Sequence, residues 1–164
     1  SLDSHSHASV RRLSQRYTSL IMIEVISKSW GWTGIVPKEI IMTNPFGNFI
    51  IKDIVGNFWR ICPEEVSCEI IANSNAEYCS LLHDQEFIDD WEMKNLVEYS
   101  NQNIGGLSEG KSYCLKIPGT LGGEYGGDNI GIISTKELIE FSGHIGKEIS
   151  DLPDGSQIEL DFIK

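Results

Sequence analysis

Motifs that mark common classes of enzyme are missing from this sequence of 164 residues. No Gly-Lys-Ser/Thr follows a glycine-rich segment, and no three glycines have the G-x-G-x-x-G spacing of a dinucleotide-binding loop. Neither a Ser-His-Asp set nor a Cys-His pair can be placed, and His144 is interpreted as a surface or capping residue of a helix. We therefore predict no catalytic residues, no cofactor and no enzymatic turnover.

Long apolar runs are also missing. A membrane-spanning helix needs about 18 or more apolar residues in succession, and the densest apolar segment, residues 20–26, is interrupted by Glu24. The sequence does not begin with a basic and then apolar signal peptide. We expect a cytoplasmic protein that makes no contact with a membrane.

Paired cysteine motifs are the third absence. None of the four cysteines, Cys62, Cys68, Cys79 and Cys114, belongs to a C-x-x-C pair. We interpret them as reduced thiols in the core of a cytoplasmic protein. A zinc site made by these cysteines together with His83 is the less favoured alternative, so we predict no metal site.

Basic residues are scarce in the second part of the chain, and the formal net charge is −11. Up to Ile61 there are seven Lys and Arg against four Asp and Glu, whereas after Ile61 there are six against twenty. Such acidity argues against nucleic acid as a direct partner, because phosphates would be repelled. The residues alone leave two interpretations open, a surface that maintains solubility or a field that attracts a basic partner.

The first part of the chain predicts one long amphipathic helix over about residues 9–28. Its apolar residues recur at helical spacing and have arginines between them; they are Val10, Leu13, Tyr17, Leu20 and Ile21. The glycine-flanked Trp30 and Trp32 end this helix, and they either pack under a turn or form a contact surface. We divide the chain into this helix and tail (1–29) and one globular domain (30–164).

The middle of the chain predicts an antiparallel meander followed by helices. Residues 48–52 and 57–62 form a hairpin, and residues 66–72 form a third strand. Helices are expected over 76–83 and over 85–102, and the second should be bent because its apolar residues form two faces. Asp89 and Asp90 lie in the first turns of the second helix, where the helix dipole favours acidic residues, and a pair of catalytic carboxylates is the alternative interpretation.

Residues 113–155 predict a strand, a glycine-rich loop, a short strand, a capped helix and a turn. Ser134 and Glu137 form a capping box, and Gly143 and Gly146 should kink or break the helix that follows. A closing strand is expected over residues 158–162. The fold class is therefore α+β, a mostly antiparallel sheet of five to six strands with helices packed on it. The expected core residues are Phe49, Ile51, Trp59, Leu115, Ile132, Leu138 and Leu160.

Eight short segments, from Trp30 onward, resemble the type VI secretion DNase-immunity family, which is akin to the yeast cell-wall-assembly-regulator-like immunity superfamily. The segments, in order, are WGWTG (30–34), NPFGN (44–48), WRICPEE (59–65), FIDDW (87–91), LKIPG (115–119), LGGEY (121–125), ELIEFSG (137–143) and DLPDG (151–155). The order of these motifs is fairly specific, and the family has no catalytic motif to transfer.

The resemblance implies a cytoplasmic immunity protein that neutralises an antibacterial toxin by binding it. The toxin is expected to be basic and nuclease-like, which suits the acidity of this chain. The candidate toxin-binding residues are Glu124, Tyr125, Asp128, Asp89, Asp90, Glu64, Glu65, Trp30 and Trp32. Two alternatives stay open, a regulatory module with another protein partner and a small nucleotide-binding protein that uses the loop of residues 119–131.

Overall fold

The computed structural model describes residues 3–157 as helices and antiparallel strands, which confirms the α+β class. The helices are α1 (Asp3–Trp30), α2 (Asn75–Leu81), α3 (Gln85–Glu92), α4 (Lys94–Asn103) and α5 (Thr135–Ser150). The strands are β1 (Pro37–Thr43), β2 (Phe49–Asp53), β3 (Phe58–Cys62), β4 (Ser67–Ala72), β5 (Lys111–Leu115) and β6 (Ile130–Ser134).

The described strands form two sheets where one had been expected. Strands β1 to β4 form a meander in chain order, and the predicted hairpin is confirmed by the pairing of Ile51 with Trp59. Strands β5 and β6 pair only with each other, with Tyr113 opposite Ile132. The predicted strand 158–162, which includes Leu160, lies outside the described residues.

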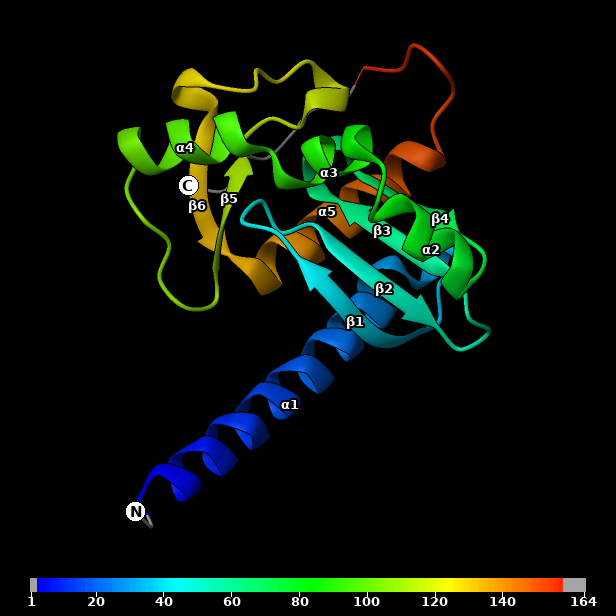
Figure 1. Cartoon of the computed structure of the whole chain (residues 1–164). Coiled ribbons are helices and arrows are strands. Elements are labelled where there is room, and N and C mark those ends of the chain that lie inside the picture. The colour runs from blue at the N-terminus through cyan, green and yellow to red at the C-terminus, as the bar shows by residue number, and fades with distance from the viewer. Residues whose placement is uncertain (1–2, 158–164) are drawn as a thin grey trace.

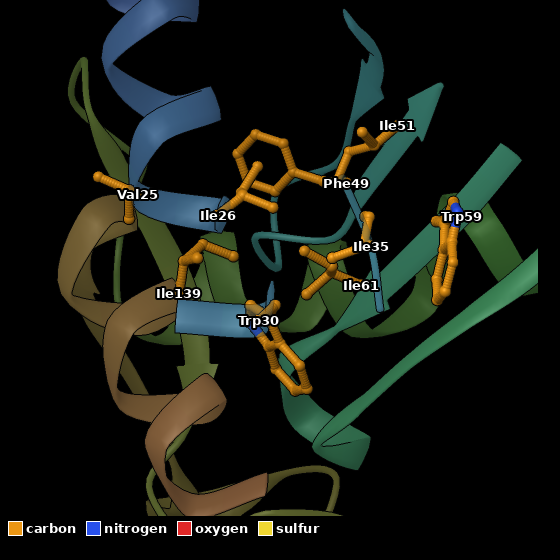
Figure 2. Packing of buried hydrophobic residues seen from close by; sticks show 9 residues of the cluster. All are labelled: Val25, Ile26, Trp30, Ile35, Phe49, Ile51, Trp59, Ile61 and Ile139. Carbon is orange, nitrogen blue, oxygen red and sulfur yellow. The ribbon is translucent and has the colours of Figure 1, made fainter. Parts of the chain in front are cut away.

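Both faces of the larger sheet are covered, and Figure 2 shows the packing on one of them. There, side chains of β2 and β3 meet the end of α1 and the start of α5 in a cluster that includes Ile26, Trp30, Phe49, Ile61 and Ile139. Because side chains alternate along a strand, Ile50 and Phe58 point to the opposite face. They pack there with Tyr78 of α2 and Trp91 of α3, and Phe58 stacks on Tyr78 with ring centroids 4.3 Å apart.

The β5–β6 pair has its own small core. Phe46, Tyr113, Leu115 and Ile130 pack together there, with side chains of α4 against them. Ile132 was predicted to be buried, and this is wrong, because its side chain is 39% exposed. Among residues 3–157, β6 has a strand beside it only on the β5 side, so its other edge is not covered by a described strand. The other described residues of the predicted core are buried: Phe49, Ile51, Trp59, Leu115 and Leu138.

Helix α1 is longer than predicted, and much of it extends away from the rest of the molecule (Figure 1). Its last turns enter the core through Val25, Ile26 and Trp30. The apolar residues of its predicted amphipathic part, Val10, Leu13, Tyr17 and Leu20, are exposed. This apolar face of α1 is therefore not packed against other described residues.

The four cysteines are free, but they do not all lie in the core. Cys62 is buried, Cys68 and Cys114 are half-buried, and Cys79 is exposed on α2. Burial raises the pKa of the Cys62 thiol far above its ordinary value, and it raises that of Cys68 to about 11. The assignment of Cys79 as a core thiol is wrong, because α2 covers the sheet with Tyr78 and turns the next residue outward.

The predicted kink at Gly143 and Gly146 is also wrong, since α5 continues without a break to Ser150. Packing explains both glycines. A Cβ on Gly143 would lie 2.4 Å from the backbone oxygen of Ser29, and one on Gly146 would lie 3.0 Å from the Trp32 ring. Glycine lets α5 approach the end of α1 closely, and the Trp32 indole N–H donates to the Gly143 carbonyl at 3.1 Å.

Substitution of Gly143 by Ala should therefore destabilise the protein. Alanine favours a helix by up to about 1 kcal/mol over glycine, but the clash with backbone should outweigh this gain and leave a net loss of about 1–3 kcal/mol. Urea denaturation measures the difference. Lys147→Ala, on the exposed side of the same helix, is the control and should change stability by less than about 0.5 kcal/mol. A stabilised Gly143→Ala variant would contradict the close approach.

Asp53 fixes the β2–β3 hairpin through its buried carboxylate. One oxygen accepts from the Val55 and Asn57 amides, both at 2.9 Å, and the other accepts from the Trp59 indole N–H at 2.8 Å. Burial tends to raise the pKa of Asp53, but these hydrogen bonds outweigh burial and hold it below the ordinary value.

Asp53→Asn should lower the free energy of unfolding by about 1–3 kcal/mol, because an amide cannot accept at both positions. The depressed pKa adds stability that is present above the pKa of the unfolded state and is lost as the pH falls through that of the folded state. Urea denaturation between about pH 5 and about pH 2 measures this loss, which should be smaller in Asp53→Asn. Equal pH dependence in the two proteins would show that Asp53 does not carry it.

Candidate functional site

Two adjoining hollows bring together most of the predicted site residues. The larger hollow, of about 790 Å³, lies between the α3–α4 junction and the glycine loop, and its lining includes Asp89 and Tyr99. The smaller hollow, of about 280 Å³, lies over β3, β4 and the 3-10 turn Pro63–Glu65 (η2). Asp90, Met93 and Tyr125 line both hollows. We call the two together the acidic face.

The bend between α3 and α4 positions the aspartates and confirms the predicted bend. Met93 separates the two helices in the left-handed conformation, with a φ of 48°, which is uncommon for a residue other than glycine. The Asn44 side chain, from the turn before β2, donates to the Trp91 carbonyl at 2.9 Å and so ties the end of α3 to the sheet. This bond fixes where α3 presents Asp89 and Asp90.

The glycine loop between β5 and β6 is held from inside. The side chain of Asn129 accepts from the Ile117 amide at 2.9 Å and donates to the carbonyls of Ile117 and Glu124 at 2.9 and 2.7 Å. A Cβ on Gly119 would lie 2.7 Å from the Tyr125 ring, so this glycine provides the space in which the tyrosine rests. The loop therefore presents Tyr125 from a defined position.

A buried hydrogen-bond network lies under the smaller hollow, with the fully buried side chain of Asn48 at its centre. Its amide nitrogen donates to both carboxylate oxygens of Glu64, at 3.0 and 2.8 Å. Its oxygen accepts from the Arg60 guanidinium at 3.1 and 3.0 Å. Arg60 in turn forms an ion pair with Asp90 and lies over the Trp91 ring, 5.3 Å from its centroid. The network joins strands, η2 and α3 under one surface.

Negative charge dominates the acidic face. Five carboxylates line it, those of Glu64, Glu65, Glu69, Asp89 and Asp90, against two basic side chains, Arg60 and Lys94. Lys94 is also neutralised by Glu92, with an N–O distance of 3.0 Å. Burial raises the pKa of Glu64, although Asn48, the Cys62 thiol and the Arg60 charge act in the opposite direction. The surface therefore favours a cationic partner over an anionic one.

The structure brings five of the nine predicted residues together here: Asp89, Asp90, Tyr125, Glu64 and Glu65. Glu124 and Asp128 are exposed on the same loop as Tyr125 without lining either hollow.

The two tryptophans lie elsewhere. Trp30 is fully buried and stacks on Trp32 with ring centroids 5.8 Å apart, so Trp30 has no surface to offer a partner. Trp32 lines a separate groove between α1 and α5. Their packing under the turn, one of the two interpretations of this loop, is thus confirmed for Trp30.

Sequence reasoning missed Asn48, Arg60 and Tyr99. The residues next to Asn48 and Arg60 in the sequence give no sign of a hydrogen-bond network, so the sequence predicts only that both belong to strands. Strand alternation is the one feature that could have located Arg60, because it places Arg60 on the same face of the sheet as Ile50, its cross-strand partner. The hydroxyl of Tyr99 accepts from the Gly127 amide at 3.2 Å. The second face of the bent helix was the feature of the sequence that could have indicated Tyr99.

Asn48→Ala should destabilise the protein by about 3 kcal/mol, because it deprives a buried carboxylate of its amide donor. The cost should be smaller when Glu64 is already Gln, since no charge is then left without that donor. A double-mutant cycle in urea measures the coupling. Asn101→Ala, at an exposed position of α4, is the control and should be nearly neutral. Additive costs for Asn48→Ala and Glu64→Gln would contradict the network.

Within residues 3–157, no cluster of three or more His, Cys, Asp or Glu has the arrangement of a metal site. No helix in this part of the chain has the length and apolar character to cross a membrane.

The chain was compared with models of protein families and with curated proteins. Residues 72–146 match the family model described as "T6SS immunity protein Tdi1, C-terminal". No curated protein matches the chain. The matched residues contain the α3–α4 bend, the glycine loop and most of α5. Over these residues the chain is similar to the type VI secretion immunity family, the family that its motifs resemble.

Proposed function

We propose that this protein neutralises a basic, nuclease-type effector of a type VI secretion system by binding it through the acidic face. The observation that carries the proposal is the convergence of Asp89, Asp90 and Tyr125 from two segments about thirty-five residues apart on one concave surface. Both segments belong to the part of the chain that matches the immunity family. Binding would block the effector in the cytoplasm of the cell that makes both proteins.

The composition of the acidic face suits protein binding. Rim carboxylates such as Asp89, for which no ion pair is formed within residues 3–157, would raise the association rate with a basic partner. Tyr99 and Tyr125 are both partly exposed aromatic side chains at the larger hollow, the kind of residue that supplies most of the energy in an interface. The protein would act stoichiometrically and without turnover.

A nucleotide-binding role for the glycine loop has less support. A phosphate cradle needs free backbone N–H groups that point toward the ligand. Here the amides of Leu121 and Gly123 donate to the Pro118 carbonyl, both at 3.0 Å, and the Gly122 amide donates to Gly119 at 3.0 Å. The loop uses these donors for its own turns, so we favour protein binding over nucleotide binding.

The first experiment identifies the effector and tests the activity. The full chain, tagged, is used to purify its partner from the source cell, and the partner is expressed alone in a second host. We expect the partner to be toxic and to degrade DNA, and an equimolar amount of this protein to abolish both effects. A partner without toxicity would favour a regulatory binding module, and no inhibition of a toxic partner would overturn the proposal.

Variants of the acidic face should weaken binding to the identified effector in two distinct ways. Asp89→Lys should slow association by about tenfold or more, with a smaller effect as salt rises from about 0.1 M to about 1 M and screening shortens from about 10 Å to about 3 Å. Tyr125→Ala should instead speed dissociation, at a cost of about 2 kcal/mol or more. Surface plasmon resonance separates the two rates.

Glu140→Lys is the matched control, because it makes the same change of charge on an exposed site between α1 and α5, outside both hollows. It should leave both rates close to wild type. The same charge reversal at Glu124 and Asp128 tests whether the flanking loop residues contribute to the association rate. If all of these variants bind like wild type, the effector contacts another surface.

A further inference from the structure

The carboxylate of Glu64 is an unusual group at the floor of the smaller hollow. Its residue is only 5% exposed, yet it lines a hollow that is open to solvent. In residues 3–157 it forms no ion pair, although Arg60 is in the same network. Burying a carboxylate without a cation in contact costs free energy, and here that carboxylate lies beside a hollow that solvent can enter.

Asn48 explains why Arg60 does not neutralise Glu64. The carboxamide lies between them and presents its nitrogen to the carboxylate and its oxygen to the guanidinium. This orientation is fixed by chemistry, because a carboxylate can only accept and a guanidinium can only donate. Arg60 is further held by Asp90 and by the Trp91 ring. Glu64 thus lines the hollow with a carboxylate that has no ion-pair partner among residues 3–157.

We propose that Glu64 receives one cationic side chain, a lysine or arginine of the effector, which enters the smaller hollow beside Tyr125. This inference rests on the proposed function and names the contact that its binding site would make. Glu65 and Glu69 also line the smaller hollow and would attract the same cationic side chain. Tyr125 would contact the aliphatic part or the charged group of that side chain. The Thr120 hydroxyl donates to the Glu65 carbonyl at 2.5 Å and so connects the glycine loop to η2 beside the smaller hollow.

Binding of such a cation should be linked to pH. Burial raises the pKa of Glu64 in the free protein, and a cation in contact would lower it, so the complex would release a proton and binding would tighten as the pH rises. The charged and titratable groups around Glu64 are Arg60 and Cys62 of β3, Glu65 of η2, Glu69 of β4, Asp90 of α3 and Tyr125 of the loop.

The test uses the full chain and the purified, inactivated effector identified above. Glu64→Gln keeps the shape of the side chain and removes its charge, and it should weaken binding by about tenfold or more, mainly through faster dissociation. Wild-type affinity should rise between about pH 5 and about pH 8, and the rise should be smaller in Glu64→Gln. Glu140→Gln is the matched control and should follow wild type.

Two further measurements keep the inference falsifiable if Glu64→Gln folds poorly. Ser67→Met leaves Glu64 in place and fills part of the smaller hollow, and it should also weaken binding. Lysines and arginines of the effector are changed to Met one at a time, and one of them should lose its effect when Glu64 is Gln.

The outcomes separate this inference from the proposed function. If wild type binds the effector and Ser67→Met and Glu64→Gln bind equally well with the same pH profile, Glu64 is not the receptor, while the immunity function stands. If wild type does not bind or inhibit the effector, the proposed function itself is wrong. If Glu64→Gln weakens binding and one lysine or arginine of the effector loses its effect in that variant, the result supports both the inference and the proposed function.

Discussion

The hydrogen bonds of one buried carboxamide connect the parts of this structure that matter for recognition. Asn48 directly precedes β2, and the turn before it is fixed by Asn44, whose oxygen accepts from the Phe46 and Asn48 amides at 3.0 and 3.1 Å. From there the network reaches Arg60 in β3 and Glu64 in η2. Because each of these polar groups is covered by the packed strands and helices, each needs its partner to be in place. The same contacts that hold the sheet together thus fix the floor of the acidic face.

The rest of the acidic face is built on rigid supports. The left-handed Met93 sets the angle between α3 and α4, and the Asn129 side chain closes the glycine loop over itself. Tyr125 and the aspartates of α3 are therefore presented in fixed positions, which reduces the entropy lost on binding a partner. Preorganisation of this kind is suited to an inhibitor that has to bind its toxin tightly and quickly.

The acidic and the basic residues of this protein lie on different parts of the molecule. The acidic face is lined by residues of β3, β4, α3, α4 and the glycine loop, whereas Arg11, Arg12 and Arg16 are exposed residues of α1, the helix that extends away from the rest of the molecule (Figure 1). A dipolar arrangement of this kind would orient a basic partner toward the acidic face as the two proteins approach. It would also place the basic helix away from that partner.

Local sequence patterns determined the elements of this fold, and tertiary contacts decided how they are used. The sequence predicted three strands of the meander but not β1, the two apolar faces of residues 85–102 predicted the bend, and the Ser134 cap predicted the start of α5, because each of these features depends on neighbours in the chain. The charge split showed that the acidity lies after Ile61, but not that Glu64 is buried while Asp89 is exposed. Helix propensity predicted a kink at Gly143, whereas the approach of the Ser29 backbone requires glycine in a continuous helix. The hollow, the Asn48 network and the division into two sheets depend on contacts between segments distant in sequence, and no local pattern encodes those.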